Sequence, residues 1–223
     1  MRQVKRCYEL MSLLSTGKVY SWDDLKKYSN SPGRDVKRLL EEGLLKKVGP
    51  GLYLPPKKGR FGVVPATEEQ LVNGFLKTDD FLLFSTNLYN TLGLGLTQLK
   101  NETVVYNNKR HEVVFLSGRQ YHFKRPNNGF PNKLTNEFLL VDLMNNIKSV
   151  GEVPSKIQQK VVHAVRSDKF NMIFLLEVAN KYGKVGTKKF FSQFVPNKPR
   201  LTRRINGKLL PSSHSKAINR KVA

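Results

Sequence analysis

Apolar side chains recur every three to four residues along three stretches near the N-terminus, a spacing typical of short amphipathic helices. The first stretch covers residues 2–15. The second opens at Ser21, an N-cap residue that is followed three positions later by an acid. The third begins at Ser31 and Pro32, a cap with proline at the first helical position, and ends at Gly43. The pattern predicts three short helices.

The third predicted helix has two distinct faces. Its inward stripe is Val36, Leu39 and Leu40, whereas Arg34, Lys37, Arg38 and Glu41 recur on the opposite face. A basic helix face is often only solvated, but an arginine guanidinium can also bond guanine O6 and N7 together. Arg34 and Arg38 are therefore better candidates for base contacts than Lys37.

Two strand-like runs follow, at 45–48 and 52–54, joined by the turn Gly49-Pro50-Gly51. Three helices and then a hairpin is the order of a winged helix-turn-helix, in which the third helix enters the major groove and the hairpin rests on the DNA backbone. We therefore predict such a domain over residues 1–60. Its candidate phosphate contacts are Lys46 and Lys47 on the first strand and Lys57, Lys58 and Arg60 after the second.

The middle of the chain alternates helical and strand-like patterns. A capping box starting at Thr67 opens one helix, and Ser85 is positioned to cap another. Strand-like runs then occupy 102–106, 111–116 and 120–124. From Leu134 to residue 195 one helical stretch follows another. The predicted fold class is α+β: the winged helix-turn-helix, then a domain over 61–195 with a short antiparallel sheet and a C-terminal helical subdomain.

Charge directs attention to polyanions as partners. The 223 residues include 39 Lys and Arg against 17 Asp and Glu, a formal net charge of +22. Residues 1–60 hold 14 basic and 6 acidic residues, 61–150 hold 9 and 8, and 196–223 hold 8 and none. Basic ends around a near-neutral middle indicate nucleic-acid contacts at the ends. We interpret 196–223 as a disordered basic tail, either a solubilising end or a phosphate-binding arm.

Convergent catalytic or metal-binding groups are not evident in the sequence. Cys7 is the one cysteine, His111 and His122 have no third ligand nearby, and Asp79 and Asp80 are adjacent and so point apart. We therefore predict no catalytic site, no metal and no cofactor. No apolar run reaches the roughly 18 to 20 residues of a membrane span, and no signal peptide is evident, so we expect a cytoplasmic protein without a membrane partner.

Several motifs together resemble the AbiEi-like antitoxins of bacterial type IV toxin–antitoxin systems. The motifs are Gly51-Leu52-Tyr53, Phe84-Ser85-Thr86-Asn87-Leu88-Tyr89 with Leu92-Gly93-Leu94, and Phe123-Lys124-Arg125. The similarity spans roughly residues 15–195. The resemblance implies that the N-terminal winged helix, through Arg34, Lys37, Arg38, Lys46 and Lys47, represses the operon's own promoter. It also implies that the region 61–195 neutralises a nucleotidyltransferase toxin resembling AbiEii, encoded next door, in phage defence by abortive infection.

We therefore expect an antitoxin and transcriptional autorepressor that binds double-stranded DNA at inverted repeats of its own promoter, as a monomer or a dimer. Whether the toxin is contacted directly stays open, and the basic tail departs from the family pattern. One alternative is a winged-helix regulator without a toxin, whose middle domain binds a small ligand. Another is an RNA-binding protein that works through its tail and its aromatic strands.

Overall fold

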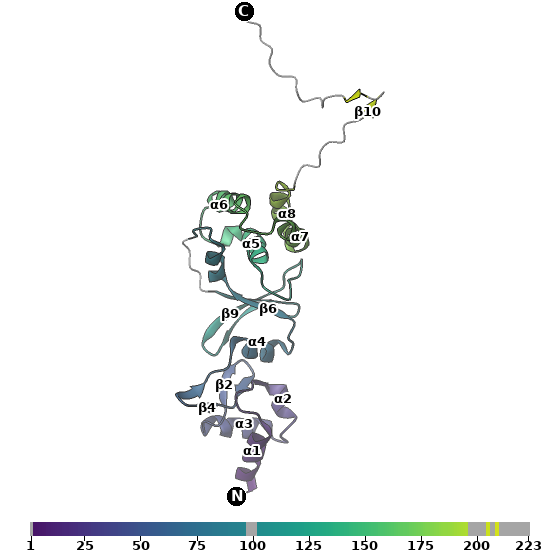
Figure 1. Ribbon diagram of the computed structural model, residues 1–223. Coiled ribbons are helices and arrows are strands. Elements are labelled where there is room, and N and C mark those ends of the chain that lie inside the picture. The colour runs from purple at the N-terminus through teal and green to yellow at the C-terminus, as the bar shows by residue number, and fades with distance from the viewer. Residues whose placement is uncertain (1, 97–101, 196–203, 206–207, 210–223) are drawn as a thin grey trace, which may run out of the picture.

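The computed structural model describes residues 2–96 and 102–195, together with 204–205 and 208–209. The protein is a mixed α+β chain with an elongated shape (Figure 1). One end holds the first three helices, the middle holds the largest sheet, and the other end is a layer of helices (Figure 1). The predicted α+β class is confirmed.

The N-terminal part contains three helices and a small antiparallel sheet. These elements are α1 (Arg2–Leu13), β1 (Tyr20–Ser21), α2 (Trp22–Lys26), α3 (Pro32–Glu41), β2 (Lys46–Gly49) and β3 (Leu52–Leu54). The strand order is β1-β3-β2. Leu10, Leu25 and Leu39 are almost fully buried at the centre of this part, where the three helices meet. Three predicted helices and the predicted hairpin are therefore all present.

Both predicted N-cap residues lie at the start of their helices, but only one of them caps through its side chain. Ser21 caps α2 as predicted, because its side chain accepts from the Asp24 amide and the Asp24 side chain accepts from the Ser21 amide. Ser31 and Pro32 take the predicted cap and first helical positions of α3, but the Ser31 side chain makes no capping hydrogen bond. Ser29 organises this turn instead: its hydroxyl donates to Asp35 at 2.5 Å and accepts from the Ser31 amide at 2.9 Å.

A second hairpin that the sequence analysis did not predict follows Pro55 and Pro56. It consists of β4 (Lys57–Gly59) and β5 (Gly62–Val64), paired from Lys57 with Val64 to Gly59 with Gly62. Every residue of both strands is exposed. Such a hairpin escapes prediction because it lacks the alternation of buried and exposed positions by which strands are recognised.

The central sheet is mixed, which corrects the predicted antiparallel sheet. Its strands are β6 (Phe81–Ser85), β7 (Thr103–Asn107), β8 (Glu112–Leu116) and β9 (Arg119–Lys124), in the order β6-β7-β9-β8. β9 runs parallel to β7, and the other neighbours are antiparallel. β9 lies between β7 and β8, and its side chains Tyr121 and Phe123 are buried. Val113 and Phe115, on the edge strand β8, are exposed. β6 itself was not predicted as a strand.

Both faces of this sheet are covered. α4 (Glu68–Leu76), capped by Thr67 as predicted, lies against one face. The core on that face also includes Val48, Leu52 and Leu54 of the N-terminal hairpin, so it joins residues from both sides of position 60. The other face packs against the helices at the far end of the molecule (Figure 1). These are η1 (Thr86–Leu92), α5 (Asn136–Asn145), η2 (Ile147–Ser149), α6 (Pro154–Arg166), α7 (Met172–Tyr182) and α8 (Val185–Ser192).

The basic C-terminal tail falls almost entirely outside the described residues. Within it, β10 (Arg204–Ile205) pairs with β11 (Lys208–Leu209) in an antiparallel arrangement. The prediction of disorder for 196–223 otherwise concerns residues that the structure does not describe.

Candidate functional site

The basic face of α3 is the first part of the candidate nucleic-acid interface. Arg34 and Lys37 are exposed on it. Lys37 Nζ lies 4.0 Å from Glu41 Oε1, and Arg38 Nε donates to Glu42 Oε1 at 2.9 Å. The Arg38 guanidinium holds the pKa of Glu42 below its usual value. Arg38 thus already pairs with a carboxylate, whereas no described residue bonds or ion-pairs with the Arg34 guanidinium.

The turn of the first hairpin is occupied by contacts within the chain. The Trp22 amide donates to the Gly51 carbonyl at 2.7 Å, and the Ser117 amide donates to the Val48 carbonyl at 2.6 Å. A Cβ on Gly49 would lie 2.6 Å from Leu116 Cδ2, so this turn is packed tightly against the end of β8. In the predicted wing, the two lysines of β2 and Pro50 at the turn are exposed, whereas the Val48 and Gly51 carbonyls are engaged within the chain.

The remaining predicted site residues lie on two exposed hairpin strands and one turn. Lys46 and Lys47 are exposed on β2. Lys57 and Lys58 are exposed on β4, and Arg60 is exposed in the turn between β4 and β5. The eight basic residues that the sequence singled out thus belong to three surface elements of the N-terminal part, α3, β2 and the β4–β5 hairpin.

A polar site in the other half of the molecule was missed by the sequence analysis. Asp142 on α5 is 3% exposed, yet its side chain is fully engaged. Oδ1 accepts from the Tyr106 hydroxyl at 2.6 Å and from Asn146 Nδ2 at 3.1 Å, and Oδ2 accepts from the Tyr89 hydroxyl at 2.6 Å. The available signal was a single acid within the apolar run from Phe138 to Met144.

Burial governs the proton affinity of this cluster. Desolvation raises the pKa of Asp142, although the two tyrosine hydroxyls and the charges of Lys124 and Lys184 oppose the rise. Desolvation and the neighbouring carboxylate both raise the pKa of Tyr89 and of Tyr106. The tyrosines therefore stay protonated and act as donors to Asp142 across the ordinary pH range.

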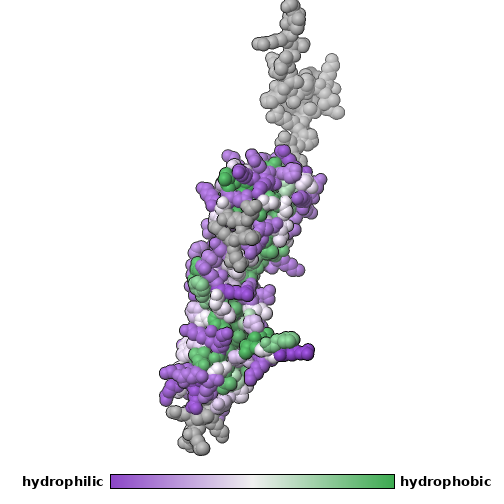
Figure 2. Space-filling model, turned by 90° about the vertical axis from the view of Figure 1, so that its left-hand side faces the viewer, coloured by the Kyte–Doolittle hydropathy of each residue, from purple (hydrophilic) through white to green (hydrophobic). Residues whose placement is uncertain are grey.

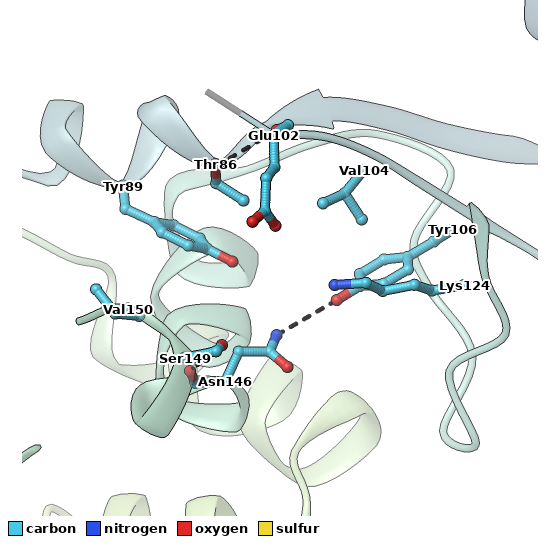
Figure 3. Close-up of a pocket in the computed structure, with 9 residues that line it drawn as sticks. All are labelled: Thr86, Tyr89, Glu102, Val104, Tyr106, Lys124, Asn146, Ser149 and Val150. Carbon is cyan, nitrogen blue, oxygen red and sulfur yellow. Dashed lines mark hydrogen bonds between the residues drawn. The ribbon is translucent and has the colours of Figure 1, made fainter. Parts of the chain in front are cut away.

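A small pocket adjoins this cluster (Figure 3). It is lined by Thr86, Tyr89, Glu102, Val104, Tyr106, Lys124, Asn146, Ser149 and Val150. The Glu102 and Lys124 side chains point into it (Figure 3). Its volume of about 40 Å³ suits water rather than a metabolite, since ligand pockets usually measure roughly 300 to 1,000 Å³.

The described part of the chain also lacks two other kinds of site. Within it, no three His, Cys, Asp or Glu side chains come together in a way that could hold a metal ion. None of its helices has both the length and the apolar character needed to span a bilayer.

Comparison with known proteins adds no assignment: neither a protein-family model nor a curated protein matches the chain.

The Asp142 cluster makes a prediction about stability. Tyr106→Phe removes one donor from a buried carboxylate, and we expect it to lower the free energy of unfolding by about 1.5 to 3 kcal/mol, the range for hydrogen bonds to charged groups. Tyr121→Phe is the matched control. Tyr121 is fully buried in the same sheet, and no described group hydrogen-bonds its hydroxyl, so its loss should leave stability unchanged or raise it. Urea denaturation followed by circular dichroism measures both. Equal losses in the two variants would contradict a special role for the Tyr106 hydroxyl.

Proposed function

We propose that this chain is a winged helix-turn-helix DNA-binding protein that represses its own promoter and serves as the antitoxin for a nucleotidyltransferase toxin. The observation that carries the DNA-binding part is the exposed basic face of α3, the third helix of the unit α1-β1-α2-α3-β2-β3. That element order, with the sheet order β1-β3-β2, is typical of winged helices.

In this proposal α3 enters the major groove. Arg34 is the leading base-reading residue, because its guanidinium is exposed and not held by a carboxylate of the described chain. Arg38 is the second base-reading residue. On binding DNA it exchanges its ion pair with Glu42 for a guanine edge or a phosphate. Lys37, Lys46 and Lys47 bind phosphates, which set the register of the protein on DNA without reading sequence.

The antitoxin part rests on the resemblance of the sequence to AbiEi-like antitoxins. It assigns toxin neutralisation to 61–195, where the charge is close to balanced through residue 150. Repression would place two copies on an inverted repeat, since half-sites mirror the symmetry of the bound protein. The neighbouring reading frame should then encode a nucleotidyltransferase, and a regulator with no toxin would lack that neighbour.

A gel-shift titration tests the repressor directly. The full-length protein is titrated against its own upstream DNA and a scrambled duplex of equal length, at several salt concentrations. We expect a preference for the upstream DNA of about a thousandfold or more, as for specific regulators. Equal affinity for the two duplexes that collapses with salt would mean purely electrostatic binding and would favour the RNA-binding alternative.

Arg38→Ala tests the reading of bases by α3. We expect a loss of about 1 to 3 kcal/mol on the cognate site together with a relaxed sequence preference. Arg166→Ala, the same change at an exposed position of α6, is the control and should leave binding unaltered. Removing Arg38 also takes away the cation beside the Glu42 carboxylate, which would then repel DNA phosphates. The double variant Arg38→Ala/Glu42→Gln separates that repulsion from the lost contact. Equal weakening on cognate and scrambled DNA would make Arg38 a phosphate contact.

Lys46→Ala tests the contribution of β2. We expect weaker binding to all sequences and a slope of log affinity against log salt that is lower by about one unit, because one phosphate contact is lost. Lys156→Ala, at an exposed position of α6, provides the matched control. An unchanged slope for Lys46→Ala would remove β2 from the interface.

A further inference from the structure

The β4–β5 hairpin has a composition that the winged-helix proposal does not explain. Gly59 pairs with Gly62, so Arg60 and Phe61 form the two-residue tip. Phe61 is 97% exposed, and Val63 and Val64 on β5 are 57% and 43% exposed. In Figure 2, a projection from the lower half of the molecule carries a hydrophobic area next to strongly hydrophilic residues. The exposed ring and the two exposed valines together leave an apolar surface on this hairpin that is accessible to a partner.

The charge near the ring favours a polyanion as the partner of this hairpin. Lys57, Lys58 and Arg60 precede Phe61 in the sequence, and no acid occurs between residues 55 and 66. The Arg60 guanidinium carbon lies 5.7 Å from the Phe61 ring centroid, so cation and ring approach a partner together. A DNA duplex offers both required features, phosphates for the cations and stacked bases between which a flat ring can insert.

The base of the hairpin is held in place. The Gly17 amide donates to the Pro55 carbonyl at 2.8 Å, and Pro56 and Pro65 flank the two strands. Gly62, directly after the tip, has φ +113°, a conformation that other residues rarely adopt. Three residues per strand reach about 10 Å from that base. The tip is therefore presented in a defined position, which lowers the entropic cost of binding.

The dimensions favour the minor groove for the tip. The minor groove is about 6 Å wide and admits side chains but not a two-stranded ribbon. Its negative potential attracts arginine, and inserted phenylalanine wedges unstack base steps from that side. We propose that the hairpin 57–64 is a minor-groove wedge: Phe61 inserts between two base pairs, Arg60 lies in the groove, and Lys57 and Lys58 bind the flanking phosphates. This inference rests on the proposed DNA-binding function and deepens it, since it adds DNA bending.

Bending is the measurement that tests the wedge. The full-length protein is bound at saturation to a duplex of its upstream DNA that carries a donor and an acceptor dye at its two ends. Energy transfer then reports the bend, which for minor-groove wedges is about 20 to 90°. Phe61→Ala should abolish most of the bend and weaken binding by about tenfold, the scale of one lost stacking contact. Phe61→Leu should retain the bend, because leucine also serves as a wedge.

Val63→Ala is the matched control, an exposed apolar residue of the same hairpin that does not lie at the tip. It should leave bend and affinity unchanged. A bend that persists in Phe61→Ala, or bound wild-type DNA that stays straight, overturns the wedge while the repressor proposal stands. If the protein bends DNA but shows no preference for the upstream sequence, the repressor proposal is overturned and the wedge proposal stands. If the protein binds anionic lipid vesicles through Phe61 and leaves its bound DNA straight, the tip is a membrane contact and the wedge proposal is overturned.

Discussion

A single buried carboxylate ties together the half of the molecule that follows residue 80. Asp142 on α5 accepts from Tyr89 in η1, which precedes it by 53 residues, and from Tyr106 in β7, which precedes it by 36. Removing a charge from water is expensive, and it is tolerated here because three donors replace the lost water. Asn146 belongs to the C-terminal end of α5 itself, whereas the two tyrosines come from η1 and β7, so the Asp142 carboxylate links α5 to both of these elements.

The opposite face of the same sheet determines what the N-terminal part can present to a partner. Val48, Leu52 and Leu54 share a core with α4 and the strands β7 to β9, and the Ser117 amide bonds to Val48. The base of the first hairpin's turn is therefore anchored within the chain, while Pro50 stays exposed. Exposed basic groups remain on α3, on β2 and on the β4–β5 hairpin, both strands of which are exposed along their length.

Local signals predicted most of the helices and the first hairpin. Ser21 and Thr67 cap their helices as expected, because a capping box involves only residues three positions apart. The strand order could not be predicted from the sequence. The parallel pairing of β7 with β9 depends on which strand is buried on both faces, and that is a property of the assembled sheet. The strands β4 and β5 have no alternation of buried and exposed residues by which they could be recognised. The Asp142 cluster could not be predicted because it joins residues that lie far apart in the chain.

The sequence by itself determined the α+β class, the helix positions of the N-terminal part, the excess of basic charge there and the eight basic residues that form the candidate site. These depend on short-range spacing and on composition. The tertiary structure decided which of those residues are paired, which hairpin tip is free and where a buried acid finds its donors. Such properties depend on contacts between segments distant in the sequence, and the energies of those contacts exist only once the chain has folded.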